Sequence, residues 1–196
     1  MTKGIIFDLD GTLIQLSINY DIIQKTLKEF FCTSENLAPL IPTIIKLSKN
    51  DQNKINTSFD IICKEEILAS KNFQTMNNAV EILKFLKSEN LTLCLVTMQC
   101  RNALEKILSK MNVLDLFDSI ITRDENHDRF EQIMNSLKNT NLNPSDVLVV
   151  GDRIHDIESA KKAGCIPVLK INETKKNPSF ECKKIQNLIE IQKLIN

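Results

Sequence analysis

The chain has 196 residues, of which 42% are hydrophobic, and its 25 basic and 25 acidic side chains give a formal net charge of zero. This length favours one core domain with a modest insertion. Because the charges balance, no long-range field favours nucleic acid or an anionic membrane surface, and we expect neither as a partner. No apolar run approaches the length of a membrane span, and the N-terminus lacks a signal-peptide pattern. We expect a cytoplasmic protein that is a monomer or homodimer.

The cysteine pattern gives no indication of a metal site. None of the six cysteines are spaced as Cys-x-x-Cys, and the chain has only two histidines, so we expect no zinc site. Cys94 and Cys165 fall on or beside expected buried strands, where thiols behave as small apolar groups. We predict that the cysteines are reduced. Cys100 stands out because it lies three residues past Thr97.

The first expected element is a short buried strand over residues 3–7, whose apolar and small residues include two β-branched ones. It runs into Asp8, Asp10 and Gly11, and the glycine ends the strand. Two carboxylates therefore lie at the carboxyl end of a strand, where open α/β folds place their ligands. Taken alone, Asp8 is equally well explained as a turn residue that accepts backbone hydrogen bonds.

Residues 15–78 contain no convincing strand. Their apolar spacing predicts a helix across residues 18–31, a break at Pro39 and Pro42 with a short helix after Pro42, and a third helix around residues 61–69. We interpret this segment as a small helical subdomain inserted into the core.

After residue 78 the pattern alternates between helix and strand. The expected elements are helices at 79–87, 103–111, 130–137, 154–163 (with Gly164 at the C-terminal cap) and 183–194, and strands at 91–97, 119–122, 147–150 and 165–171. Repeated βα units imply a parallel sheet with right-handed crossovers. We predict the α/β class: a Rossmann-like parallel sheet with helices on both faces, formed by residues 1–14 and 79–196, plus a small α-helical cap subdomain of residues 15–78.

Two more strands end in side chains that suit phosphate or metal binding. The strand at 147–150 runs into Gly151 and Asp152, and Asp156 follows four residues later. The strand at 91–97 ends in Thr97, whose side chain carries a hydroxyl. Asp156 is also explained as a helix N-terminal acid, and Thr97 as an ordinary β-branched strand residue. Three buried strands with such ends are nevertheless hard to explain as turns.

Together these residues resemble the motifs of the haloacid dehalogenase-like (HAD) hydrolase superfamily, from the first strand to about Val168. Asp8-Leu9-Asp10-Gly11-Thr12 resembles its first motif, Thr97 its second, and Gly151-Asp152-Arg153-Ile154-His155-Asp156 its fourth, followed by the family-like Ser159-Ala160-Lys161-Lys162-Ala163-Gly164. The resemblance implies a central first strand, flanked by the second-motif and fourth-motif strands. It also implies that the insertion is a cap, as in phosphoglycolate-phosphatase-like members.

The resemblance further implies Mg²⁺-dependent hydrolysis of a small-molecule phosphomonoester through an aspartyl-phosphate. Asp8 would be the nucleophile, while Asp10 would protonate the leaving group and then activate water. Mg²⁺ suits an all-oxygen site, with Asp8, the backbone carbonyl of Asp10 and Asp152 as its ligands and Asp156 acting behind them or through water. Thr97 would bind a phosphoryl oxygen. Dehalogenating members lack an Asp at the Asp10 position, so Asp10 favours a phosphatase or phosphotransferase.

The chain departs from the family at the third motif, which is a Lys that neutralises the nucleophile and the phosphoryl group. The segment 122–133 contains no Lys. His127 lies near the usual position by count, Arg129 is the better permanent cation because Arg stays charged and binds phosphate bidentately, and Arg123 is a third candidate. Each is also explained as a solvated loop charge. We favour Arg129.

Two other functions remain open. A phosphotransferase, such as a mutase, would use the same intermediate. A catalytically weak member would bind a ligand or partner; the missing Lys motivates this alternative, and the intact set of Asp8, Asp10, Asp152 and Asp156 argues against it.

Overall fold

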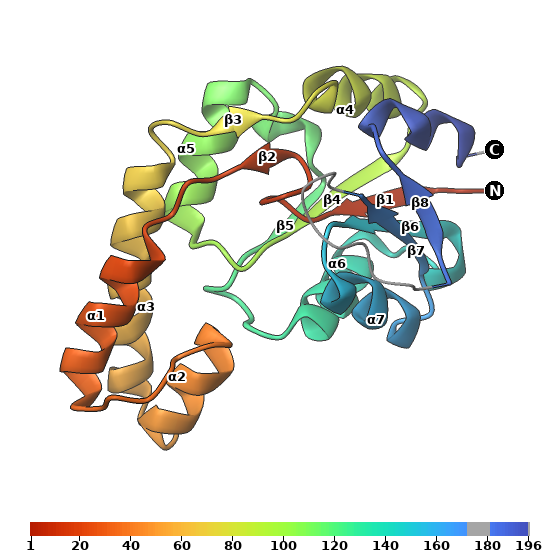
Figure 1. Ribbon diagram of the computed structural model, residues 1–196. Coiled ribbons are helices and arrows are strands. Elements are labelled where there is room, and N and C mark those ends of the chain that lie inside the picture. The colour runs from red at the N-terminus through yellow and green to blue at the C-terminus, as the bar shows by residue number, and fades with distance from the viewer. Residues whose placement is uncertain (172–180, 196) are drawn as a thin grey trace.

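The computed structural model describes residues 1–171 and 181–195 and contains a six-stranded parallel sheet (Figure 1). Its strands, in spatial order, are β5 (Ser119–Ile121), β4 (Thr92–Val96), β1 (Gly4–Phe7), β6 (Val147–Gly151), β7 (Ile166–Lys170) and β8 (Lys183–Ile185). The predicted α/β fold is confirmed, with β1 between the second-motif strand β4 and the fourth-motif strand β6.

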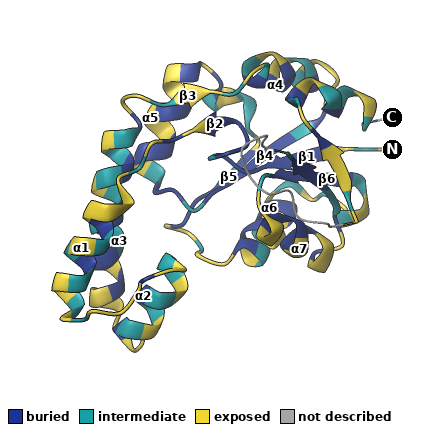
Figure 2. Ribbon diagram, viewed as in Figure 1, coloured by how far each residue is buried: buried dark blue, intermediate teal, exposed yellow. Residues whose placement is uncertain are grey.

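Helices cover both faces of the sheet. They are α4 (Ala79–Ser88), α5 (Arg101–Met111), α6 (Arg129–Thr140) and α7 (Ile154–Lys162), with short 3₁₀ helices η1 (Leu114–Leu116) and η2 (Pro144–Asp146) between elements. Ile5 and Phe7 pack in the cluster that includes α4 and α5, whereas Ile6 packs in the cluster that includes α6 and α7. The central strands are thus buried on both faces (Figure 2), which explains why they are nearly continuous apolar runs in the sequence.

The insertion consists of α1 (Tyr20–Phe31), α2 (Leu40–Ser48) and α3 (Gln52–Ala69), which lie to one side of the sheet in Figure 1. These helices share an apolar cluster separate from the two that flank the sheet, with the buried members Ile23, Leu27, Leu37, Ile44 and Ile62. The segment from 15 to 78 therefore has a small core of its own, and we call it the helical insertion. No helix among the described residues is both long and apolar enough to cross a bilayer.

Within the insertion, two details differ from the prediction. Helix α2 begins at Leu40, so Pro42 lies inside its first turn instead of before it. A proline is tolerated there because the first backbone N–H groups of a helix have no intrahelical partner. The segment also ends in a short antiparallel pair, β2 (Ile14–Gln15) with β3 (Gln74–Thr75). Strands of two residues are too short to give an alternating pattern.

The expected helix at 183–194 is wrong. Residues 183–185 form β8, which pairs with β7, and η3 (Leu188–Lys193) is a 3₁₀ helix. Ile185, Leu188 and Ile191 are buried at a spacing of three, which suits a 3₁₀ helix as well as an α-helix. The strand forms because β7 otherwise exposes an unpaired edge of the sheet.

The prediction of reduced cysteines is wrong for Cys63 and Cys100, which form a disulfide across 37 residues of sequence. Cys63 lies on α3 and Cys100 immediately precedes α5, so the bond joins the insertion to the core. The packing of α3 against α5 brings the two sulfurs together, and no local spacing could indicate it. Cys32, Cys94, Cys165 and Cys182 are free thiols.

Candidate active site

Three carboxylates meet at the carboxyl edge of the sheet. The backbone N–H of Asp8 donates to the carbonyl of Val150 at 2.9 Å, which continues the β1–β6 pairing beyond Phe7. Because the two strands are parallel neighbours, Asp8 and the Asp152–Asp156 segment emerge at the same edge. Carboxylate oxygens of Asp8, Asp152 and Asp156 all lie within 4.8 Å of one another.

Gly11 allows the Asp152 carboxylate to approach the β1 loop closely. Its φ of +90° is in the region that L side chains rarely adopt. A Cβ at Gly11 would lie 2.5 Å from Asp152 Cγ, well inside normal contact. The glycine after Asp10 is therefore required both by the turn and by the packing of the fourth-motif carboxylate.

Arg129 lies between two of these carboxylates. Its Nη2 is 2.6 Å from Asp8 Oδ1 and its Nε is 3.1 Å from Asp156 Oδ1, with all three side chains buried. Arg129 is the first residue of α6, where the Asp128 side chain accepts the N–H of Glu131 and caps the helix. The start of α6 thus brings the Arg129 guanidinium into contact with Asp8, the proposed nucleophile.

The other two candidates for the third-motif cation lie elsewhere. Arg123 is buried in an ion pair with Glu66 of α3, with a separation of 2.7 Å. His127 is exposed, and its ring contacts Phe59 of α3 with a centroid distance of 6.1 Å. Of the three, only Arg129 contacts the carboxylate group within the described residues.

The carboxylate group carries an excess of buried negative charge. Burial raises the pKa of Asp8 from 3.8 to about 7; Arg129 opposes this shift, while Asp156 and Asp152 add to it. Three clustered carboxylates facing one guanidinium suit a hard divalent cation, which oxygen ligands bind. The donor set therefore fits Mg²⁺. It includes Asp156, which we expected to support the metal ligands or to act through water instead of binding the metal directly.

The Asp10 carboxylate is oriented by the start of the insertion. Its Oδ1 accepts the backbone N–H of Leu16 at 2.8 Å, and the turn between them is closed by the Gly11 N–H donating to the Ile14 carbonyl.

Thr97 lies at the end of β4 and is almost completely buried. Its Oγ1 accepts the backbone N–H of Gln99 at 3.2 Å, and its carbonyl accepts a hydrogen bond from the Gln132 side chain at 2.9 Å. These contacts shape the turn over residues 97–100, which we call the β4 loop.

Sequence reasoning gave no role to Arg153 and Tyr20. The Arg153 side chain is 62% exposed, and its Nε lies 3.8 Å from Asp152 Oδ1. The Tyr20 side chain of α1 lies near Arg153; partial burial and then the nearby Asp10 raise the pKa of Tyr20, and Arg153 opposes the shift. The signal for Arg153 was its position beside Asp152 in the fourth motif, whereas nothing in the sequence indicated Tyr20.

Comparisons with known proteins agree with this geometry. A family model described as haloacid dehalogenase-like hydrolase matches residues 5–169. The chain is 27% identical to a putative pyrophosphatase PpaX of Clostridium perfringens, over all of both chains. It is 28% identical to a phosphoglycolate phosphatase of Aquifex aeolicus, over 83% of this chain and 81% of that one.

Solved structures have the same fold. A HAD-superfamily hydrolase from Ehrlichia chaffeensis is 25% identical with a TM-score of 0.66, covering 100% of this chain and 97% of that one. A putative haloacid dehalogenase-like hydrolase from Bacteroides fragilis is 18% identical with a TM-score of 0.77, covering 97% of this chain and all of that one. With the family match spanning most of the sequence and the motif carboxylates gathered at one edge of the sheet, the chain belongs to the haloacid dehalogenase-like hydrolases, as a member of the phosphatase type.

Proposed function

We propose that the protein hydrolyses small-molecule phosphomonoesters with Mg²⁺, through an aspartyl-phosphate formed on Asp8. The observation that carries the proposal is the buried Asp8 carboxylate, 2.6 Å from Arg129 and grouped within 4.8 Å with Asp152 and Asp156. This grouping of carboxylates around a fixed cation supports the proposal, because phosphoryl transfer requires a nucleophile, countercharge and metal ligands at one point.

In the first step, an Asp8 carboxylate oxygen attacks phosphorus, and the bond to the ester oxygen breaks while Asp10 gives that oxygen a proton. In the second step, Asp10 takes a proton from a water molecule that attacks the aspartyl-phosphate, which releases inorganic phosphate and restores Asp8. The hydrogen bond from the Leu16 N–H to Asp10 Oδ1 orients this carboxylate throughout.

Asp8, Asp152 and the backbone carbonyl of Asp10 would hold Mg²⁺, with Asp156 near enough to bind it directly or through water. The metal would neutralise charge on the phosphoryl oxygens. Arg129 supplies a fixed positive charge at the position for which the family uses Lys, and Thr97 would bind a phosphoryl oxygen.

We propose that the helical insertion acts as a cap and that the leaving group is anionic. Pyrophosphatase and phosphoglycolate phosphatase, the names of two relatives, both describe substrates whose leaving group carries negative charge. Arg153 lies beside Asp152 and Tyr20 and is well exposed, so its guanidinium is available to contact such a group. We also propose a cytoplasmic site of action.

The test is release of inorganic phosphate from an aryl phosphate, pyrophosphate and phosphoglycolate, with Mg²⁺ and with chelator. Asp8→Asn is the control because it is nearly isosteric and removes the nucleophile. We expect metal-dependent release that is absent in the variant, together with a phosphorylated Asp8 trapped by rapid acid quench and found by mass spectrometry. Full activity of Asp8→Asn would refute the assignment of the nucleophile.

A further inference from the structure

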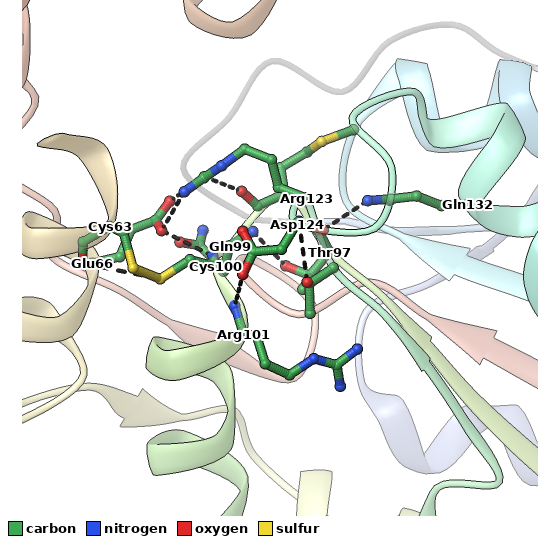
Figure 3. A network of polar contacts seen from close by, with 11 residues as sticks. Cys63, Glu66, Thr97, Gln99, Cys100, Arg101, Arg123, Asp124 and Gln132 are labelled. Atoms are coloured by element: carbon green, nitrogen blue, oxygen red, sulfur yellow. Dashed lines mark hydrogen bonds and ion pairs between the residues drawn. A yellow bond between two sulfur atoms is a disulfide. The ribbon is translucent and has the colours of Figure 1, made fainter. Parts of the chain in front are cut away.

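Helix α3 of the insertion holds the β4 loop through a buried carboxylate. Glu66 is almost completely buried, and its Oε2 accepts the backbone N–H of Cys100 at 2.9 Å (Figure 3). Cys100 is both the last residue of the β4 loop and the residue before α5. A side chain of the insertion therefore fixes the backbone only three residues from Thr97.

Arg123 holds the same loop from the core side. Its Nη1 lies 2.7 Å from Glu66 Oε1 and its Nη2 3.0 Å from Glu66 Oε2, a bidentate pair. Its Nη1 also donates to the Met98 carbonyl, and its backbone N–H donates to the Gln99 carbonyl at 3.3 Å. The Glu66–Arg123 pair consequently binds each residue from 98 to 100 through its backbone.

The disulfide adds a covalent bond to this contact. Cys63 and Glu66 are three residues apart on α3 and so lie on the same face of the helix, and both contact Cys100. Figure 3 shows the sulfur bridge beside the Glu66 carboxylate. The disulfide and the hydrogen bond from the Cys100 N–H to Glu66 thus join the insertion to the β4 loop, and the ion pair between Glu66 and Arg123 braces this contact. We call the four residues the clasp: Cys63, Glu66, Cys100 and Arg123.

We propose that Glu66 is a positioning residue that holds the β4 loop in its phosphate-binding shape, and that the Cys63–Cys100 disulfide makes this hold sensitive to thiol redox state. The inference rests on the proposed function, since it takes Thr97 as a phosphate ligand. Thr97 is coupled to the clasp because its Oγ1 accepts the N–H of Gln99, which lies inside the clasped segment.

The redox step is an ordinary thiol–disulfide exchange. A dithiol reductant gives two electrons and two protons, the bond between the two sulfurs breaks, two thiols form, and the reductant becomes a disulfide. Glu66 then holds the loop without covalent help. Disulfides in reducing compartments are usually transient and either catalytic or redox-sensing, which suits a bond placed between the insertion and the β4 loop.

The first test compares the oxidised protein with the same protein after treatment with dithiothreitol. A hydrogen bond to a charged oxygen is worth about tenfold or more in affinity, so for a loosened loop that weakens the contact of Thr97 with phosphate we expect KM and the inhibition constant of inorganic phosphate each to rise about tenfold. The Cys63→Ser variant should show the raised values with or without reductant. Cys32→Ser is the matched control, because Cys32 is a free, exposed thiol of the insertion and its variant should keep the response.

The second test is Glu66→Gln, which keeps an acceptor for the Cys100 N–H but loses the charge that Arg123 binds. We expect KM and the phosphate inhibition constant to rise with a much smaller change in kcat. Glu65→Gln, the same change one residue earlier on α3, should alter neither. Should thermal unfolding show Glu66→Gln to be poorly folded, Glu66→Gln/Arg123→Gln removes both buried charges together and should show the same rise in KM.

The outcomes separate this inference from the proposed function. An oxidised protein that releases no phosphate from any ester refutes the proposed function and the inference with it. An active protein whose KM and phosphate inhibition are unchanged by Glu66→Gln, and by reduction that thiol titration confirms, refutes the inference alone. A fall in KM on reduction would also refute it, since the disulfide would then restrain the insertion from opening.

Discussion

Replacing Arg129 by Ala removes the permanent cation nearest the proposed nucleophile. Its guanidinium contacts Asp8 at 2.6 Å, and the two charge centres are about 4 Å apart, which corresponds to about 4 kcal/mol at an effective dielectric constant near 20. This attraction opposes the burial that raises the pKa of Asp8 to about 7. Without Arg129 this opposition is lost, and the pKa of Asp8 in the metal-free protein rises further.

We expect Arg129→Ala to lower kcat by about 10²–10³, the loss typical for removal of one preorganised electrostatic contact to a transition state. Part of the loss should be recovered as the pH is raised, because ionisation of Asp8 favours both its nucleophilic form and the binding of Mg²⁺. The assay is a pH profile of phosphate release at fixed Mg²⁺. Arg129→Lys, which keeps the charge but loses the planar bidentate contact, should retain much more activity.

His127→Ala is the matched control, because His127 is the alternative by sequence count and is exposed. Changes at exposed positions are usually worth less than about 0.5 kcal/mol, so its kcat should be nearly that of the wild type. Wild-type activity in Arg129→Ala, or an equal loss in His127→Ala, would refute the assignment of the third-motif cation and the electrostatic reasoning behind it.

Three further results are expected. Because burial raises the pKa of Asp8 from 3.8 to about 7, ionisation of Asp8 destabilises the metal-free fold as the pH rises through 7. Binding of Mg²⁺ should therefore raise Tm more at pH 8 than at pH 5, and equal increments would contradict this. Gly11→Ala should lose more stability in denaturant titrations, and more Mg²⁺ affinity in calorimetric titrations, than Gly164→Ala. Both glycines have a positive φ, but only a Cβ at Gly11 would overlap Asp152, and equal losses would argue against this packing. Arg153→Ala should raise KM for pyrophosphate more than for an aryl phosphate, and a uniform rise would remove Arg153 from leaving-group binding.

The fold was predictable because its signal is local. The strands β1, β4 and β6 are buried on both faces, so each appears in the sequence as an apolar run, and the helices between them carry their own periodicity. The candidates Asp8 and Asp152 were predictable for the same reason, since each directly follows such a strand. Parallel pairing then places them at one edge without any further information.

The features that were missed depend on contacts between distant segments. Cys100 stood out only by its distance from Thr97, nothing in the sequence linked it to Cys63, and nothing marked Glu66, whose partner Arg123 lies 57 residues away. Only the packing of α3 against α5 and the loop after β5 brings them together. Strand β8 likewise forms because the edge of β7 is available, whereas Lys183 and Lys184 give no apolar run.

The charge balance explains why an arginine in place of the family's lysine is compatible with catalysis. Asp8, Asp152 and Asp156 carry three negative charges when ionised, the buried Arg129 offsets one of them, and the largely exposed Arg153 offsets part of another from 3.8 Å. The negative charge that remains suits a divalent cation such as Mg²⁺, which such oxygen ligands bind. Arg129 also reaches Asp8 with Nη2 and Asp156 with Nε at the same time, so it fixes the relative positions of two carboxylates, which the point charge of a lysine does less well.

A protein that had given up catalysis would have no reason to keep this excess of buried negative charge, and replacing the acids by neutral residues would stabilise it. The arrangement therefore argues for turnover and against the alternative of a binding protein with a degenerate site.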